Sequence, residues 1–178
     1  SDRRYDKYNF AIHDYFFAKT LDKVRPGGIV AFITSTGTLD KQNPAVRKYI
    51  SQRAELLGAV RLPNNAFKSY AGTQVSSDII FLQKRDRMID IAPEWVYTGT
   101  DAQGHVINNY FAEHPEMILG NVVEGNNLYG SKGITVEPFE NADLKELLSG
   151  AVKNIAGKYE AEKAVIAKPD ESKSQKDN

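Results

Sequence analysis

The chain has 178 residues, 41% of them hydrophobic, which is enough for one or two small domains with hydrophobic cores. Its 23 basic and 23 acidic residues give a formal charge of zero, so no global field attracts nucleic acid, and polyanion binding would need a local patch. Cysteine is absent, which excludes disulfides, zinc–thiolate sites and thiol nucleophiles.

Helices and strands are predicted to alternate in the first part of the chain. Residues 10–24 carry aromatic and aliphatic side chains at helical spacing, and "RPGG" ends this helix. The run "IVAFIT" at 29–34 is apolar at every position, as is typical of a parallel strand covered on both faces. Asn43 and Pro44 resemble an N-cap and a first-turn proline, which predicts a helix to about Arg53.

Two further strands, at 57–62 and 75–82, continue the pattern of an open α/β sheet, of which the three strands supply only one side. No helix separates them, so we expect them to pair antiparallel across the loop between them, with 29–34 as a central strand. Nothing upstream pairs with the other edge of 29–34, and the chain begins at Ser1 without a methionine. We therefore interpret it as a piece of a longer protein.

The second part has a different texture. A hairpin is predicted around 101–104, a short helix limited by Pro115, and a small β element around 131–133. Residues 141–155 form the clearest amphipathic helix, with Asn141 or Asp143 as its cap. We expect its Leu148 and Val152 to be buried against residues 95–139 and not against the first sheet. The expected units are residues 1–87, a small α+β connector at 88–157, and a charged linker at 158–178.

No catalytic or metal-binding pattern stands out. His13, His105 and His114 lack metal-ligand spacing, and His13 fits a structural role on its helix. No Ser-His-Asp order can be argued, and the glycines of "GGIVAF" precede a strand, where they cannot cradle a phosphate. No apolar run reaches the roughly 20 residues of a membrane span, so we expect a cytoplasmic protein with no membrane partner.

The loop "LPNNAF" at 62–67 is the most informative stretch, because an aromatic residue stands where a simple turn needs none. In an open α/β sheet, ligands bind beyond the carboxyl ends of the parallel strands, where this loop and the "TSTG" loop after Ile33 emerge. Phe67 with the neighbouring amide side chains suits a flat ligand such as a nucleobase. The alternative is that Phe67 packs into the core.

Three segments together resemble a known family. "DKYNFAIHDYFFAKTLDKVRPGGIVAFITS", "LLGAVRLPNNAF" and "GTQVSSDIIFLQK" are similar to the second half of adenine-specific DNA methyltransferases, including the modification subunits of type I restriction systems. The match covers about Tyr8 to Arg85. The later "NNYFAEHPEMILG" resembles methylase–helicase fusions of phages and other mobile elements.

This resemblance implies a partial Rossmann-like class I methyltransferase sheet, made of its last strands, parallel plus one antiparallel. It also implies S-adenosylmethionine as cofactor of the whole protein, double-stranded DNA as substrate, and partner segments in the same chain: an upstream methyltransferase half and a downstream helicase. The cofactor-binding strand and the Asn-Pro-Pro-aromatic motif of the family are missing here, so the isolated chain is expected to be inactive and to bind no cofactor.

The site residues that follow from the resemblance belong to the target-base side. Phe67 would stack on a flipped adenine within the loop residues Leu62, Pro63, Asn64 and Asn65, near Ser35 and Thr36 at the end of strand 29–34. Phosphate contacts are expected at Arg3, Arg4, Lys7 and Lys68. The alternative is a non-catalytic DNA-binding or interaction module of a helicase-fused protein.

Overall fold

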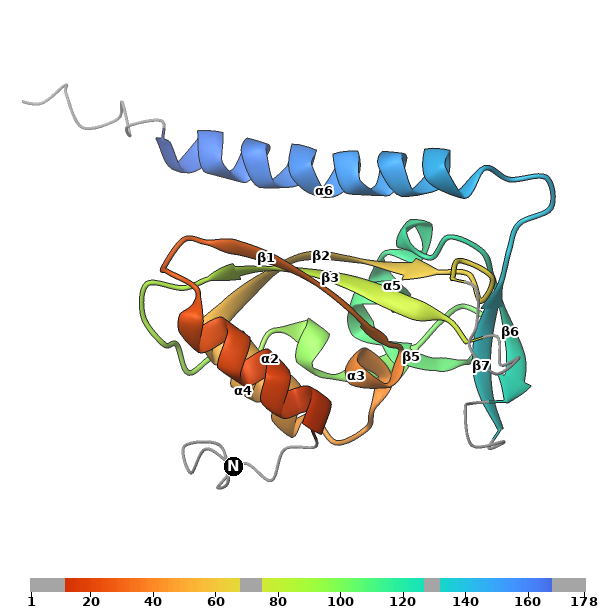
Figure 1. Cartoon of the computed structure of the whole chain (residues 1–178), viewed down its shortest axis with the longest axis horizontal. Helices are drawn as coiled ribbons and strands as arrows, with labels where there is room; N and C mark the ends of the chain where they lie inside the picture. Colours follow the sequence, from red (N-terminus) through yellow and green to blue (C-terminus); the bar gives the residue numbers. More distant parts are fainter. Residues whose placement is uncertain (1–11, 68–74, 127–131, 168–178) are drawn as a thin grey trace, which may run out of the picture.

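The structure is a computed structural model that describes residues 12–67, 75–126 and 132–167 (Figure 1). A three-stranded sheet lies between two layers, with α6 along one face and α2, α3 and α4 on the other (Figure 1). The elements of the sheet half are α2 (Ile12–Lys23), β1 (Ile29–Ser35), α3 (Gly37–Asp40), α4 (Ala45–Arg53), β2 (Ala54–Leu62) and β3 (Ser77–Lys84).

The remaining elements are short, except the last. They are the 3-10 helix η2 (Glu94–Val96), β4 (Thr98–Thr100), β5 (Val106–Asn108), α5 (Asn109–Glu113), the 3-10 helix η3 (Pro115–Met117), β6 (Asn121–Asn126), β7 (Lys132–Glu137) and α6 (Leu144–Ala167). Strands β4 and β5 form one antiparallel hairpin, and β6 and β7 form another. The predicted hairpin around 101–104 is confirmed, and α5 ends before Pro115 as expected.

The three-stranded sheet has the order β1-β3-β2, and β3 pairs antiparallel with both neighbours. The predicted antiparallel pairing of the second and third strands is confirmed. The predicted fold class, a partial Rossmann-like sheet with parallel neighbours, is wrong, because every strand pair within the described sheets is antiparallel. The physical reason is that β3 returns between β1 and β2, so the two strands that run in the same direction never become neighbours.

Strand β1 is not covered on both faces. Phe32 is 8% exposed, whereas Ile29 and Ile33 on the opposite face are 51% and 63% exposed. An uninterrupted apolar strand is buried on both faces only where other elements pack against each face of the sheet. In the described residues β1 lies at the edge of the sheet, so its expected central position is corrected.

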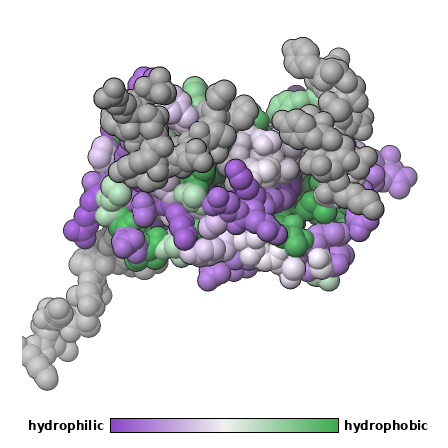
Figure 2. All heavy atoms as spheres, turned by 90° about the horizontal axis from the view of Figure 1, so that it is seen from below, coloured by the Kyte–Doolittle hydropathy of each residue, from purple (hydrophilic) through white to green (hydrophobic). Residues whose placement is uncertain are grey.

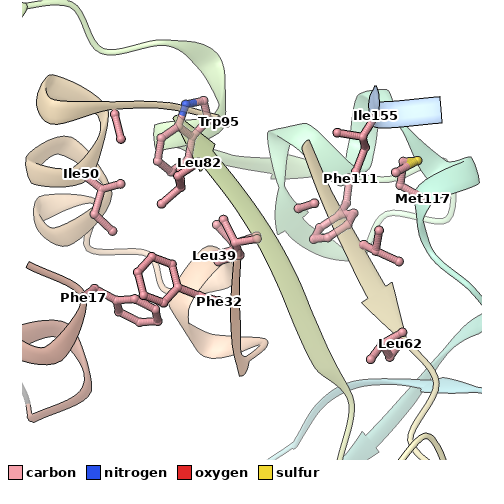
Figure 3. Packing of buried hydrophobic residues seen from close by; sticks show 14 of the residues in the cluster. Phe17, Phe32, Leu39, Ile50, Leu62, Leu82, Trp95, Phe111, Met117 and Ile155 are labelled. Carbon is pink, nitrogen blue, oxygen red and sulfur yellow. The ribbon is translucent and has the colours of Figure 1, made fainter. Parts of the chain in front are cut away.

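Buried side chains on both faces of the sheet form one hydrophobic cluster (Figure 3). On the face of α2 and α4, the rings of Phe17 and Phe32 meet edge to face, with centroids 4.7 Å apart. Beside β2, Phe111, Met117 and Ile155 come from α5, η3 and α6 (Figure 3). On the outer surface of the α2 and α4 side, hydrophobic residues occur in separate areas among hydrophilic ones (Figure 2).

Helix α6 packs on the first sheet. Its start agrees with the predicted cap, because the Asp143 carboxylate accepts a hydrogen bond from the Lys145 N–H at 2.9 Å. The helix continues to Ala167, beyond the expected end near Lys158. Val152 is 37% exposed, so its expected burial is wrong; Ile155, one turn later, is the residue that reaches β2.

Gly58 in β2 allows this close approach. A Cβ built on Gly58 would lie 2.6 Å from the Ile155 side chain and 3.1 Å from the Tyr110 hydroxyl. Gly58 also stands at a register shift between β2 and β3. The absence of a side chain therefore sets the distance between α6 and the sheet.

Among the helices of the described ranges, none combines the length and apolar composition that crossing a bilayer requires.

We predict that Gly58→Ala lowers the free energy of unfolding by about 1–3 kcal/mol, because the added methyl group overpacks the contact with Ile155. Urea denaturation of the purified chain measures this loss. The matched control is Gly150→Ala in α6, where an added Cβ meets nothing within 4 Å; there alanine should stabilise by about 0.5–1 kcal/mol through helix propensity. Equal effects of the two substitutions would contradict the packing of α6 on β2.

Candidate nucleic-acid interface

The two loops singled out in the sequence leave the sheet at the same end. Ser35 at the end of β1 and Leu62 at the end of β2 both face Ser77 of β3. Although β1 and β2 are not neighbours, they run in the same direction on either side of β3. The structure therefore brings the 62–67 loop and the Ser35–Thr36 segment to one end of the sheet.

The base of the loop is fixed. Leu62 is 3% exposed, and Pro63 is buried. The Asn64 N–H donates to the Val136 carbonyl of β7 at 2.7 Å, and the Asn64 side-chain amide donates to the Thr135 hydroxyl at 3.4 Å. Two buried residues and two hydrogen bonds to β7 hold the loop where it leaves the sheet.

The tip of the loop turns outward. The Ala66 N–H donates to the Pro63 carbonyl at 3.1 Å, which closes a tight turn. Phe67 follows with 51% of its surface exposed, and Asn65 is also exposed. The alternative expectation, that Phe67 packs into the core, is wrong. Asn64 serves the fixed base, so Asn65 and Phe67 are the loop side chains that face solvent.

The segment after β1 provides hydroxyl groups. Ser35 is exposed, and Thr36 is half-buried directly before α3. The hydroxyls of Thr34 and Thr38 hydrogen-bond each other at 2.7 Å. Directly before β3, the Ser76 hydroxyl accepts a hydrogen bond from the Val136 N–H at 2.9 Å. This end of the sheet therefore combines the exposed polar side chains of Ser35 and Asn65 with the exposed ring of Phe67.

The expected phosphate contacts Arg3, Arg4, Lys7 and Lys68 lie outside the described residues. The His105 ring has a partner in its own turn, because its Nδ1 lies 3.0 Å from the carboxylate of Asp101. Within the described ranges, no group of three or more histidine, cysteine, aspartate or glutamate side chains could hold a metal ion.

A buried charge network below this end of the sheet was missed from the sequence. Arg61 of β2 is 1% exposed, and Asp78 of β3 is fully buried. The Arg61 guanidinium donates to both oxygens of Asp78, each at 2.8 Å, and to both oxygens of Asp40 at 2.8 and 3.0 Å. It also lies 4.5 Å from the centroid of the Phe111 ring.

Asp40 and Asn108 connect this network to the second part of the chain. The Asn108 N–H donates to Asp40 at 3.0 Å, and the Asn108 side-chain amide donates to the carbonyls of Leu39 and Trp95, each at 2.8 Å. The Asn108 side-chain oxygen accepts from the Tyr110 N–H at 2.9 Å and thereby caps α5. Asn108 itself is fully buried.

Arg47 makes a second buried connection between the two parts. Its guanidinium is 1% exposed and donates to the Val96, Thr38 and Lys41 carbonyls. Among the described residues, no buried side-chain nitrogen or oxygen lacks a hydrogen-bond partner. Both arginines therefore have the partners that a buried charge requires.

Burial and pairing act in opposite directions on these groups. Burial disfavours the charge of Arg61, but the carboxylates of Asp78 and Asp40 outweigh it and raise the pKa of Arg61. Burial raises the pKa of Asp78, and the Arg61 guanidinium opposes this shift. Burial lowers the pKa of Arg47, whose hydrogen-bond partners among the described residues are carbonyls, against the attraction of Asp40. We assign the network a structural role, since its central groups do not reach solvent. The sequence does contain a signal for this network, because Arg61 and Asp78 are charged residues within the apolar strands β2 and β3.

We predict that Arg61→Ala lowers the free energy of unfolding by about 3–5 kcal/mol, because it leaves Asp78 buried without its counter-charge. Arg61→Lys should cost less, since it keeps the charge but loses the two-pronged geometry. The control Arg87→Ala removes an exposed arginine and should stay within about 0.5 kcal/mol of the unsubstituted chain. Urea titration tests all three, and an Arg61→Ala loss as small as the control's would rule out a structural role for the network.

Comparison with known proteins gives one partial similarity. Over 71 residues the chain is 35% identical to the defence against restriction protein B of Escherichia phage P1. The matched stretch is 39% of this chain and 3% of the phage protein, so the chain corresponds to a small part of that protein. No protein-family model and no solved structure matches the chain.

These findings correct the resemblance drawn from the sequence. The similarity found is to a phage protein named for defence against restriction, and not to an adenine-specific methyltransferase. The antiparallel sheets also differ from the parallel sheet that the resemblance implied. The identification as the second half of a methyltransferase domain is therefore wrong.

Proposed function

We propose that this chain is a non-catalytic, DNA-contacting module of a larger protein that acts in the context of restriction. Exposed Phe67, on a loop with a fixed base, is the observation that carries the proposal. The proposal includes neither methyl transfer nor S-adenosylmethionine, because the only support for both was the resemblance to adenine-specific methyltransferases, which is wrong. A cytoplasmic location, expected from the sequence, forms part of it.

The chemistry of the loop favours a base over a phosphate. Residues 62–67 contain no charged side chain, and the chain has a formal charge of zero. Phosphate contacts in protein–DNA complexes depend strongly on lysine and arginine, whereas any nucleobase can stack on an aromatic ring. We therefore assign Phe67 to a base that has left the helical stack of double-stranded DNA.

Uncharged polar groups at the same end of the sheet as Phe67 fit the same ligand. The exposed amide of Asn65 can donate to and accept from a base edge, and Ser35 offers a hydroxyl at the same end of the sheet. Because the loop base is held by Leu62, Pro63 and β7, little order has to be gained there on binding. A preformed loop with one aromatic contact suits recognition of a single unpaired base.

The connection with restriction comes from the similar phage protein, which is named defence against restriction protein B. Restriction acts on DNA, so a segment that contacts DNA is consistent with that name. The competing function is a module that binds another protein through the same exposed ring. The two functions differ in whether the binding partner is a nucleobase, which the next experiment decides.

We predict that the chain binds a DNA duplex with one unpaired 2-aminopurine more tightly than the fully paired duplex. Phe67→Ala should weaken binding of the unpaired duplex by roughly 5- to 150-fold, which corresponds to about 1–3 kcal/mol for one stacked base. Phe67→Trp keeps an aromatic face and should retain binding. Fluorescence anisotropy at low salt measures the affinity, and 2-aminopurine emission reports the stacking of the base.

Tyr97→Ala is the matched control, because it removes another exposed aromatic ring, 38% exposed, outside the loop. It should change neither affinity nor 2-aminopurine emission. Thermal melting of each variant separates a loss of contact from a loss of folding. Unchanged duplex binding by Phe67→Ala would contradict the base contact and favour a protein partner.

A further inference from the structure

Strand β1 has an open edge. It pairs with β3 on one side, and no segment within the described ranges pairs with its other side. In Figure 1, β1 crosses in front of β3 and β2, with α2 below it. The opposite edge of the sheet differs, because the Arg61 carbonyl of β2 accepts a hydrogen bond from the Leu119 N–H at 2.9 Å.

The register shows which main-chain groups face this edge. The Lys84 N–H donates to the Gly28 carbonyl at 2.9 Å, directly before β1 begins. Because antiparallel pairs alternate, Val30, Phe32 and Thr34 then direct their N–H and C=O groups toward β3. The groups of the intervening residues point to the open edge: Ile29, Ala31, Ile33 and Ser35.

The side chains along the edge are unprotected. The strand reads "IVAFITS", with no charged residue and no proline, and it exposes Ile29 and Ile33. Proteins usually protect exposed strand edges with lysine, proline or a bulge, since an open edge pairs readily with other chains. An apolar edge without such protection indicates a surface that is normally covered.

A hollow of about 480 Å³ adjoins this strand. Its lining is aromatic and apolar at Phe16 and Phe17 of α2 and at Phe32 and Ile33 of β1, and polar at Thr34, Ser35 and Ser77. Phe16 is 65% exposed, although it lies next to the aromatic core. A strand added beside β1 would place alternate side chains in this hollow and on the Ile29–Ile33 face.

We propose that β1 pairs with an extended strand from another segment of a longer polypeptide, which enlarges the sheet and buries Phe16, Ile29 and Ile33. The occupant is a strand with apolar side chains on both of its faces. The proposal rests on the proposed function, in which this chain is part of a larger protein. The phage protein supports that placement, because the matched stretch is only 3% of its length.

Hydrogen–deuterium exchange provides the test, with the gene product at its natural length compared with residues 1–178 alone. In the isolated chain, we expect the amides of Ala31, Ile33 and Ser35 to exchange rapidly. In the natural product these amides should exchange at least tenfold more slowly. The β4–β5 hairpin should exchange equally in both. No DNA is present, so failure of the base contact at Phe67 leaves this result unaffected.

Substitutions distinguish pairing from a general change in stability. Ile33→Lys should leave the melting temperature of the isolated chain unchanged, because Ile33 is exposed there. In the natural product it should lower the melting temperature and abolish the protection of β1. The control Val106→Lys alters a 50% exposed valine of β5 and should have little effect in either protein.

Two results would overturn the proposal. One is rapid exchange of the β1 edge amides in the natural product, whether that product is longer than residues 1–178 or identical to them. The other is slow exchange of these amides in an isolated chain that sediments as a dimer, since the occupant would then be a second copy. Sedimentation velocity at the exchange concentration identifies that case.

Discussion

The guanidinium of Arg61 is the interaction on which the arrangement of the chain depends. It lies in β2, pairs with Asp78 of the neighbouring strand, and reaches Asp40 of α3, which in turn accepts a hydrogen bond from Asn108. Sheet, helix layer and second part of the chain therefore meet at one buried charge. A buried ion pair contributes less to net stability than its geometry suggests, but it penalises any arrangement that leaves one partner alone. Its value is in specifying how the two parts fit together.

The candidate site benefits from this rigidity. Arg61 directly precedes Leu62, the buried last residue of β2, from which the loop begins. On the far side, β7 holds Asn64 through main-chain and side-chain hydrogen bonds. The loop is thus anchored by elements from both parts of the chain. The exposed ring of Phe67 follows this support at the cost of apolar surface left in water.

The sequence predicted local elements better than their assembly. Phe17, Leu21 and Ile50 recur at helical spacing because each helix buries one face, so α2 and α4 are predicted from the sequence. The lack of a predicted helix between β2 and β3 favours their antiparallel pairing. The position of β1 could not be predicted, because "IVAFIT" reads the same at an edge and in the centre of a sheet. The pairing of Arg61 with Asp40 and Asn108 joins residues far apart in the chain, and no local pattern encodes it. Phe67 was recognised as a candidate because an aromatic residue in a turn conflicts with the local rule; whether it contacts a base depends on a partner that the sequence does not contain.

The strand order has a consequence for how the chain folds during synthesis. Ser35 pairs with Ser77 and Ile29 pairs with Gln83. Each residue of β1 is therefore synthesised more than forty residues before its partner in β3. The β2–β3 pairing is more local and can form first, as soon as Lys84 has left the ribosome. Until then the apolar strand β1 has neither β3 beside it nor the complete core beneath it. Slow passage through this stage would favour contacts between nascent chains, and fast closure of the β2–β3 pair would shorten it.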